Sequence, residues 1–252
     1  DKAIMRACDT YFYELAHNLG IDNIHDFMAP FGFGTRTNID LVSEKPGILP
    51  SRFWKKATKS EPWYPGETLI AGIGQGYMLA TPLQLAVSTA ILANRGKIIA
   101  PRMVQSIETD GYIADLPEPE KSDDIILKDS TNWDKAISGM EKVIHHPRGT
   151  AHKLSKGLQY KMAGKSGTAQ VFTIKQDEKY DASKISEWHR DHALFIAFAP
   201  IENPQIAVAV IIENGGGGGT NAGPVARAMI DAYLLPQLAN ANTKPSGQEK
   251  PW

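Results

Sequence analysis

Two short apolar runs of β-favouring residues near the end of the chain constrain the fold more than any other feature. They occupy residues 193–199 and 206–212, and the linker between them reads PIENPQ. A linker this short, with two prolines and an asparagine, is typical of a turn between antiparallel strands. The sequence therefore predicts an antiparallel hairpin here.

Helical spacing of apolar residues dominates the rest of the chain. We expect helices over residues 4–19, ending at Gly20, and over residues 82–95, with Thr81 as N-cap, Pro82 at the first helical position and Gly96 as the stop. Asp9 is an alternative N-cap for the first helix. Two more helices are expected over residues 131–145 and 224–235.

The connecting segments are less regular. Residues 43–70 contain four prolines and two tryptophans, which predicts an irregular surface segment held by aromatic side chains. Residues 97–116 are expected to form strands around an Asp110-Gly111 turn. The order of helices, then antiparallel strands, then a packing helix indicates an α+β fold, with an antiparallel sheet packed between helices. One partial domain is expected over residues 1–238, followed by a disordered tail at 239–252.

Composition excludes several functions. The chain has 252 residues and a net charge of −1, so no basic excess points to nucleic acid. Its apolar runs are far shorter than the ~20 residues that cross a bilayer. Cys8 is the one cysteine, which rules out an internal disulfide.

The segment KMAGKSGTAQVF at residues 161–172 carries the clearest chemistry. Lys165, Ser166 and Thr168 surround Gly167, and β-favouring residues follow. Glycine lets another backbone approach a strand, and an edge strand can pair with an extended peptide. The lysine adds positive charge and the hydroxyls can bind a carboxylate, so the segment fits a site for a peptide acyl group. A solvated turn remains an equally open interpretation.

Other motifs have simpler interpretations. "GKS" lacks the P-loop spacing, because six residues separate Gly157 from Gly164 and strand-like residues follow. The five glycines at 215–219 favour a flexible connection over an anion cradle. The histidines form no metal-binding pattern, so surface or supporting roles are favoured for them. The histidines considered are His145, His146, His152, His189 and His192.

Five stretches, taken in order, resemble the class B penicillin-binding proteins of the cell-elongation type, the penicillin-binding protein 2 group. They read CDTYFYELAHNLGI, GIGQGYMLATPLQLA, PRGTAHK, AGKSGTAQVF and IIENGGGGG, and they cover nearly the whole chain up to the tail. The resemblance implies the penicillin-recognising serine transpeptidase fold.

The family has three motifs, and this chain matches two of them. No serine here has a lysine three residues on, so the nucleophile and its lysine are expected upstream of Asp1 and the 252 residues alone are expected to be inactive. Thr150 has that spacing to Lys153 but lies out of order. The second motif falls on residues 7–9, with Asp9 present but Ala7 in place of the family's serine.

The third motif matches residues 165–168. By resemblance, Lys165 supplies catalytic charge near Asp9, while Ser166 and Thr168, with Gly167 between them, bind the substrate carboxylate. The backbone N–H of Thr168 is implied to be one oxyanion donor. Gln75 and His192 match family positions that we interpret as structural support. Cys8 occupies the place where some relatives hold a structural zinc, whose other ligands would lie upstream.

The implied reaction is D,D-transpeptidation through a serine ester, with no cofactor needed for the chemistry. The implied ligands are peptidoglycan stem peptides ending in D-Ala-D-Ala and β-lactams, and the implied partner is a membrane glycosyltransferase of the elongation complex. The resemblance also implies an inner-membrane protein whose catalytic domain is periplasmic. Two alternatives remain: a non-catalytic peptidoglycan-binding scaffold, and a D,D-carboxypeptidase or β-lactamase on the same fold.

Overall fold

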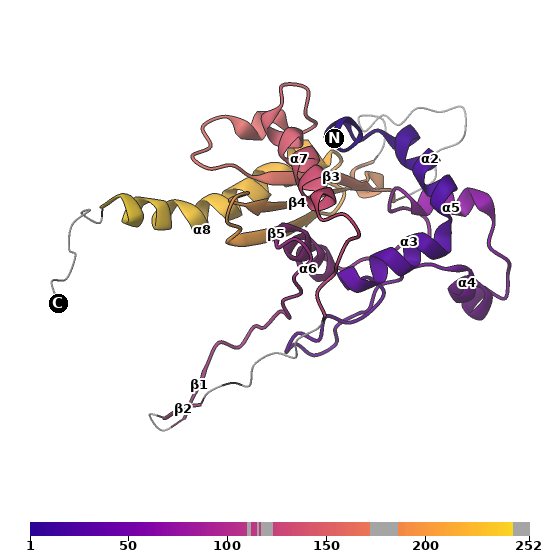
Figure 1. Ribbon diagram of the computed structural model, residues 1–252, viewed down its shortest axis with the longest axis horizontal. Coiled ribbons are helices and arrows are strands. Elements are labelled where there is room, and N and C mark those ends of the chain that lie inside the picture. Colours follow the sequence, from indigo (N-terminus) through magenta and orange to yellow (C-terminus); the bar gives the residue numbers. More distant parts are fainter. Residues whose placement is uncertain (110–111, 115, 117–122, 172–185, 244–252) are drawn as a thin grey trace.

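The computed structural model describes residues 1–109, 112–114, 116, 123–171 and 186–243. Helices dominate the first half of the chain, and a three-stranded sheet forms the centre of the second half (Figure 1). The elements, in order, are α1 (Lys2–Arg6), α2 (Asp9–Leu19), α3 (Ile21–Met28), η1 (Ala29–Phe31), α4 (Arg52–Lys59), α5 (Pro65–Ala71), α6 (Pro82–Ala93), β1 (Ile107–Thr109), β2 (Tyr112–Ala114), α7 (Thr131–His145), η2 (His152–Ser155), β3 (Ala163–Ala169), η3 (Glu187–His189), β4 (His192–Ala199), β5 (Ile206–Ile212), η4 (Gly218–Ala222) and α8 (Gly223–Thr243).

The three-stranded sheet confirms the predicted hairpin. Its order is β3-β4-β5 and both pairs are antiparallel. Ser166 pairs with Phe195, and Phe195 pairs with Val210. Because side chains alternate between the two faces of a strand, this register decides which face each residue of β3 presents.

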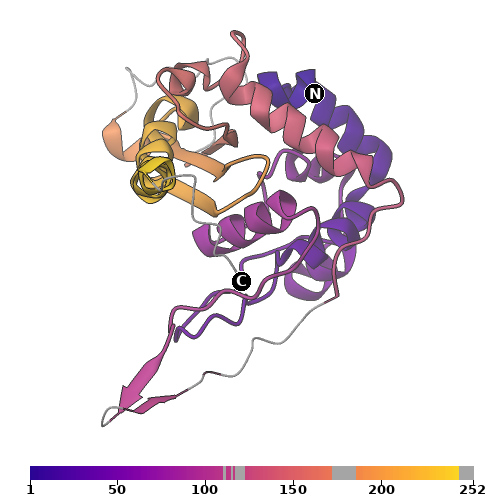
Figure 2. The same ribbon diagram turned by 60° about the vertical axis from the view of Figure 1, so that its left-hand side comes forward.

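Helices cover both faces of the sheet (Figures 1 and 2). On one face, Phe195 and the alanines of β4 share a core with Ala226, Ile230 and Leu234 of α8. On the other face, Phe198 packs with Ala93 of α6 and with Ile137 and Met140 of α7. This is the expected α+β arrangement of an antiparallel sheet between helices.

The first predicted helix is broken in two. Ala7 ends α1 in the left-handed conformation, with φ 49°, and Cys8 is the N-cap of α2. Asp9 is therefore the first helical residue of α2 and not its cap, so that part of the prediction was wrong. The break turns the chain at the residues of the expected second motif.

The expectation of an irregular segment at 43–70 was also wrong, because α4 and α5 lie within it. The Ser51 hydroxyl accepts from Trp54 N at 3.0 Å and caps α4, while Glu67 accepts from Tyr64 N at the start of α5. Aromatic side chains do hold the segment: Trp54 and Trp63 both pack on Tyr77.

Lys55 joins these two helices from the interior. Its side chain is 1% exposed, its Nζ donates to Glu67 at 2.5 Å, and it lies 4.5 Å from the centre of the Tyr64 ring. Burial is the largest single influence and opposes the charge, but the hydrogen bond to Glu67 and the nearby charges of Glu67, Tyr77 and Glu61 together outweigh it and raise the pKa of Lys55. Lys55 thus keeps its proton and its bond to Glu67 fixes α5 against α4.

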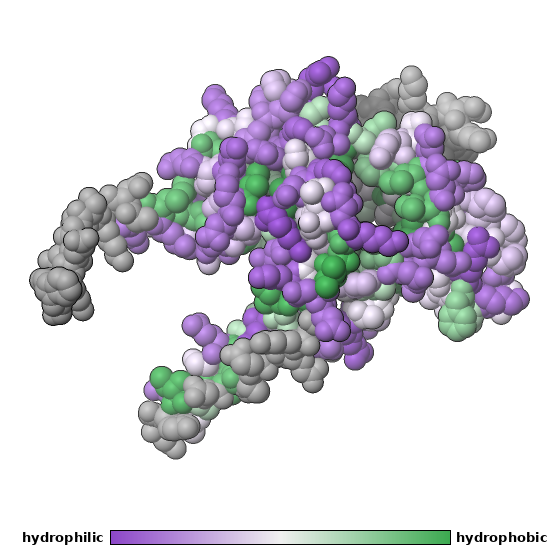
Figure 3. Space-filling view, in the orientation of Figure 1, coloured by the Kyte–Doolittle hydropathy of each residue, from purple (hydrophilic) through white to green (hydrophobic). Residues whose placement is uncertain are grey.

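The β1–β2 hairpin extends away from the rest of the molecule (Figures 1 and 2). Its predicted Asp110-Gly111 turn lies outside the described residues. Apolar side chains such as Ile107 and Ile113 are exposed along it (Figure 3). At its base, Asp40 accepts from the N–H groups of Met103 and Val104, and these bonds lower the pKa of Asp40.

Helix α8 continues to Thr243, past the predicted boundary at residue 238. The first residues of the expected tail are therefore helical, and residues 244–252 lie outside the described part. Within the ranges that the structure describes, none of the helices has the length and apolar content needed to cross a membrane.

Gln84 anchors α6, whose predicted start at Thr81 and Pro82 is confirmed. The Gln84 side chain is fully buried, and its Nε2 lies within 3.1 Å of the carbonyl oxygens of Gly32, Thr35 and Pro46. Its Oε1 accepts from Thr81 N, which completes a capping box. One side chain therefore joins the loop after η1 to the helix that lies against the sheet.

We predict that Gln84→Leu lowers the free energy of unfolding by about 3 kcal/mol or more, because each buried group left without a partner costs about 1–3 kcal/mol. Denaturant unfolding measures the change. Gln205→Leu, in the exposed turn between β4 and β5, is the matched control and should change it by less than ~0.5 kcal/mol. A loss below ~1 kcal/mol for Gln84→Leu would contradict this role.

Candidate functional site

The predicted Lys165-Ser166-Gly167-Thr168 motif lies within β3, as expected, so the P-loop interpretation fails its structural test. In the described part of the sheet, β3 pairs only with β4 and its other edge has no strand partner. The Thr168 carbonyl bonds a side chain outside the sheet, so it points to that free edge. Since the N–H and C=O of one strand residue point to the same side, the Thr168 N–H faces the free edge too.

Lys165 lies on the opposite face of β3 from Ser166. It pairs with Ile196, which packs toward α6 and α7, and its Nζ donates to the Ser166 carbonyl at 2.7 Å. Burial lowers the pKa of Lys165, while the negative charge of Asp9 raises it and so opposes the shift. The predicted residues Lys165 and Asp9 therefore interact electrostatically, although they are 156 positions apart along the chain.

Ala7 and Asp9 lie at the break between α1 and α2, and Asp9 interacts electrostatically with Lys165 of β3. Asp9 is exposed at the first turn of α2. Ala7 carries no hydroxyl, and its left-handed backbone is uncommon for a residue with a Cβ. Asp9 is thus available to interact with Lys165, whereas position 7 offers no hydroxyl.

Hydroxyl groups gather on the other face of β3. Ser166 and Thr168 share that face by alternation, and Thr168 is exposed. The Thr150 hydroxyl lies 3.4 Å from the Ser166 hydroxyl, and Thr150 N donates to Met5 O at 3.3 Å. In the sequence, Thr150 has the spacing of the first motif but lies in the wrong place along the chain to be its nucleophile. No pattern in the sequence indicates its contact with Ser166.

Gln75 reaches the free edge of β3 from the glycine loop after α5. Its Nε2 donates to the Thr168 carbonyl at 2.5 Å, across 93 positions of sequence. The flanking residues Gly74 and Gly76 both have positive φ, which only glycine adopts readily. The chain therefore turns tightly on both sides of Gln75, and these turns direct its side chain to the motif.

Gly218, within the glycine run at 215–219, packs against the backbone of the motif, so the run has a packing role besides the connection that the sequence favours. A Cβ on Gly218 would lie 2.3 Å from Leu194 O and 2.4 Å from Gly167 O. Only a residue without a side chain can approach β3 and β4 this closely. η4, which begins at Gly218, thereby supports Gly167 directly.

Polar bonds fix the start of β4 near the end of β3. Asp191 is buried, and its carboxylate accepts from Val171 N. Asn214 N donates to the His192 ring at 2.9 Å, and the Asn214 side chain donates to the Trp188 and Arg190 carbonyls. His192 thus has the supporting position that the resemblance implies.

A metal site does not form from the described residues. They contain no group of three or more His, Cys, Asp and Glu side chains suited to a metal ion, and Cys8 is exposed. His145 is occupied in accepting from Met162 N. Because this part of the chain offers Cys8 alone, it does not fit a structural zinc, and no step of the chemistry is assigned to one.

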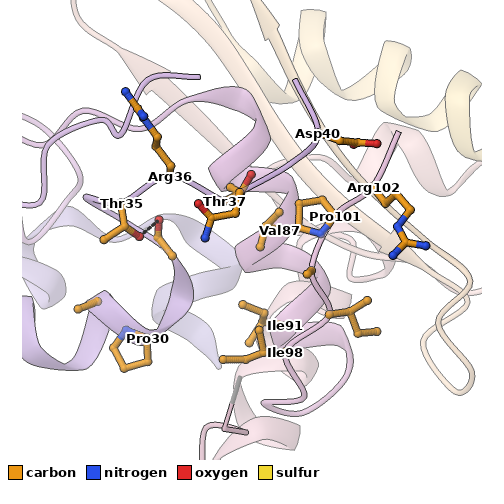
Figure 4. A pocket seen from close by; sticks show the side chains of 15 residues that line it. Pro30, Thr35, Arg36, Thr37, Asp40, Val87, Ile91, Ile98, Pro101 and Arg102 are labelled. Carbon is orange, nitrogen blue, oxygen red and sulfur yellow. Dashed lines mark hydrogen bonds between the residues drawn. The ribbon is translucent and has the colours of Figure 1, made fainter. Parts of the chain in front are cut away.

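A cavity of about 690 Å³ lies away from the motif, between the loop after η1, α6 and residues 98–102 (Figure 4). Val87, Ile91 and Ile98 form its apolar side, and Arg36 points away from them. None of the predicted site residues lines it. The candidate site is therefore the free edge of β3 and not this cavity.

Comparison with known proteins identifies the family. The family described as "Penicillin binding protein transpeptidase domain" matches residues 1–231. The chain belongs to this family.

Within this family, the chain is similar to curated proteins named as peptidoglycan D,D-transpeptidases. The peptidoglycan D,D-transpeptidase MrdA of Haemophilus influenzae is 43% identical over 99% of this chain and 39% of its own length. The Escherichia coli MrdA is 43% identical over 93% of this chain and 37% of its own length. This chain therefore spans about two fifths of the length of these relatives.

Solved structures agree on the fold. Pseudomonas aeruginosa PBP2, in a crystal structure with WCK 5153, has a TM-score of 0.81 and 51% identity, over 92% of this chain and 48% of that one. Helicobacter pylori PBP2, in a complex with MreC, has a TM-score of 0.78 and 32% identity, over 93% and 40% of the two chains. The predicted fold and family are thus confirmed.

We predict that Gly218→Ala lowers the free energy of unfolding by about 1–3 kcal/mol, because its Cβ overlaps the backbone of β3 and β4. Gly217→Ala is the matched control, since its φ of −79° suits alanine and its Cβ would meet only Thr220 at ordinary contact distance. Thermal unfolding of both variants checks this. Equal melting temperatures would show that η4 does not press on β3.

We also predict that Lys165 loses its proton below the ordinary pKa of 10.5, since its folded pKa is lowered. Unfolding free energy should then rise with pH from the folded pKa up to about 10.5, because the unfolded chain binds the proton more tightly there. Asp9→Asn should lower the pKa further by removing an attractive charge.

A ¹³C titration of lysine-labelled protein, assigned with Lys165→Arg, measures this shift. Asp22→Asn, an exposed aspartate on α3, is the charge-matched control and should leave it unchanged. A Lys165 pKa at or above 10.5, or an upward shift in Asp9→Asn, would contradict the arrangement.

Proposed function

We propose that this chain is the C-terminal part of the transpeptidase domain of a peptidoglycan D,D-transpeptidase. One observation carries the proposal: the free edge of β3 presents the Thr168 N–H beside hydroxyls and a half-buried lysine, in a chain of the transpeptidase family. An unpaired strand edge of this kind can accept an extended peptide. The relatives named as D,D-transpeptidases support the reaction class.

In the proposed reaction, a serine supplied by sequence upstream of Asp1 attacks the carbonyl between the two D-alanines of a stem peptide. A serine–acyl ester forms, the peptide bond breaks, and the serine proton reaches the departing amine, so that free D-Ala leaves. An amine of a neighbouring strand then attacks the ester, gives up a proton and regenerates the serine. The chain by itself is proposed to be inactive, because it holds no Ser-x-x-Lys.

The residues of this chain bind and orient the substrate. The Thr168 N–H would donate to the developing oxyanion, a contact whose loss typically costs about a hundred- to a thousand-fold in rate. The Ser166 and Thr168 hydroxyls, in the field of Lys165, would hold the terminal carboxylate. A lysine with a lowered pKa is also better suited to exchange a proton during acyl transfer.

The missing hydroxyl at Ala7 defines what the second motif can do here. Alanine cannot relay a proton, so this step would fall to Lys165, the upstream lysine or water. Asp9 keeps its place beside Lys165 and would stabilise the protonated lysine. We therefore assign charge balance to Asp9, both charge balance and proton exchange to Lys165, and no part in proton transfer to residue 7.

We also propose a cellular location and partners for the full-length protein that contains this chain. A solved Helicobacter pylori PBP2 is in a complex with MreC, and another structural relative comes from a peptidoglycan synthase complex. By similarity, we place the protein in the inner membrane with this domain in the periplasm. We also propose that it belongs to a cell-elongation complex with a membrane glycosyltransferase, and that it is a β-lactam target.

Fluorescent penicillin tests the proposal in the full-length protein. We predict one covalent label, mapped by mass spectrometry to a serine upstream of Asp1. Lys165→Ala should lower the labelling rate at least about a hundred-fold while the protein stays folded, since it removes the charge beside the ester. Lys161→Ala, on the same segment but exposed, is the matched control and should label normally.

The alternatives give different results in the same assay. Stem-peptide binding without any acyl-enzyme would indicate a scaffold, the class that Ala7 favours. Rapid turnover of the penicillin would indicate a β-lactamase, and release of D-Ala without cross-linking would indicate a carboxypeptidase. Each of these outcomes would contradict the transpeptidase proposal.

A further inference from the structure

Gln75 occupies a hydrogen-bonding position of the sheet that none of the strands in the described part of the chain fills. A free edge normally leaves its carbonyls to solvent or to a partner chain. At the end of β3, however, the Gln75 amide donates to the Thr168 carbonyl at 2.5 Å. The side chain thus replaces the N–H of a neighbouring strand at one residue of the motif.

The loop that carries Gln75 is fixed on both sides of that residue. Gln75 N donates to Ile70 O at 3.1 Å, and Gln75 O accepts from Met78 N at 3.4 Å. Gly74 and Gly76 supply the positive φ values that turn the chain there. Because the N–H and the carbonyl of Gln75 are both hydrogen-bonded, the backbone from which its side chain extends is held in place.

The same loop rests on the helix that begins at Asp9. A Cβ on Gly72 would lie 2.3 Å from the Ala16 Cβ, so α5 and α2 are in close contact at this point. The Lys55–Glu67 pair holds the other end of α5. Gln75 therefore links a firmly held α2–α5 unit to the edge of β3.

We propose that Gln75 is a positioning residue, which fixes the end of β3 so that the Thr168 N–H keeps its direction toward the acyl group. This inference rests on the proposed function. The Thr168 N–H belongs to the peptide unit that joins Gly167 to Thr168, and glycine leaves this unit free to rotate. The bond from Gln75 holds the next peptide unit, which contains the Thr168 carbonyl, and so restrains the first unit from the Thr168 side.

Burial and charge favour this role over a passive contact. Gln75 is half-buried, carries no charge and bonds a backbone group, so it neither attracts a carboxylate nor donates a proton in catalysis. Its effect on the reaction would act through Thr168. Loss of the bond should therefore slow acylation and leave the initial binding of the ligand nearly unchanged.

The test measures acylation of the full-length protein by a chromogenic or fluorescent penicillin. Stopped-flow data separate the acylation rate constant from the initial binding constant. Three variants probe the bond: Gln75→Ala removes it, Gln75→Glu keeps the size but removes the donor, and Gln75→Asn keeps the donor on a shorter chain. Gln205→Ala is the matched control, because the Gln205 amide also donates to a backbone carbonyl, in the turn between β4 and β5.

We expect Gln75→Ala and Gln75→Glu to lower the acylation rate constant about tenfold, the effect of one hydrogen bond on a barrier. The binding constant should change less than twofold, and Gln75→Asn should fall between wild type and alanine. Hydrogen exchange over residues 163–171 should accelerate in Gln75→Ala and remain unchanged in Gln205→Ala. Melting temperatures should stay within a few degrees of wild type.

Two results would overturn the inference. An acylation rate constant within twofold of wild type, or faster, would show that the bond does not prepare the site. A slower rate with unchanged hydrogen exchange would show that Gln75 acts on the ligand directly. If the wild-type protein forms no acyl-enzyme, the proposed function fails, and the exchange measurement still decides whether Gln75 fixes β3.

Discussion

The antiparallel pairing of β3 with β4 is the constraint on which the site depends. Its register places Ser166 opposite Phe195 and Lys165 opposite Ile196. A slip of one residue would exchange the two faces, so the lysine would enter the core beneath α8 and the hydroxyls would face α6 and α7. The chemistry of the motif thus follows from how β4 is held by its apolar side chains.

Four parts of the structure support β3. β4 bonds one edge, Gly218 of η4 presses on the backbone at Gly167, and Gln75 holds the Thr168 carbonyl at the other edge. Near the Ala163 end, α7 packs against the strand. The motif end of β3 is therefore restrained although, among the described residues, no fourth strand pairs with it.

Much of this arrangement was predictable from the sequence, because strong local signals agreed with the tertiary structure. The runs at 193–199 and 206–212 form the predicted hairpin, and Thr81 and Pro82 begin α6 as expected. The motif lies on a strand, and the charge of Asp9 acts on the pKa of Lys165, which agrees with the resemblance. These predictions succeeded because the strand and helix propensities, the helix cap and the order of the elements along the chain all favour the same fold.

Other features required the structure. The prolines of residues 43–70 suggested an irregular segment, yet Pro65 is at the start of α5, where proline is well tolerated. Five consecutive glycines suggested flexibility, whereas the close contact of Gly218 with the backbone of β3 and β4 requires a residue without a side chain at that position. Gln75 and Thr150 meet β3 only through tertiary packing, which leaves no pattern along the chain. The left-handed backbone of Ala7 likewise has no sequence signal.

A crystal structure of the full-length protein acylated by a penicillin tests the central claim most directly. The account predicts an ester on a serine upstream of Asp1, with its carbonyl oxygen within hydrogen-bonding distance of the Thr168 N–H. It also predicts that the penicillin carboxylate contacts the Ser166 and Thr168 hydroxyls. An ester whose carbonyl and carboxylate both lie away from β3 would contradict the account.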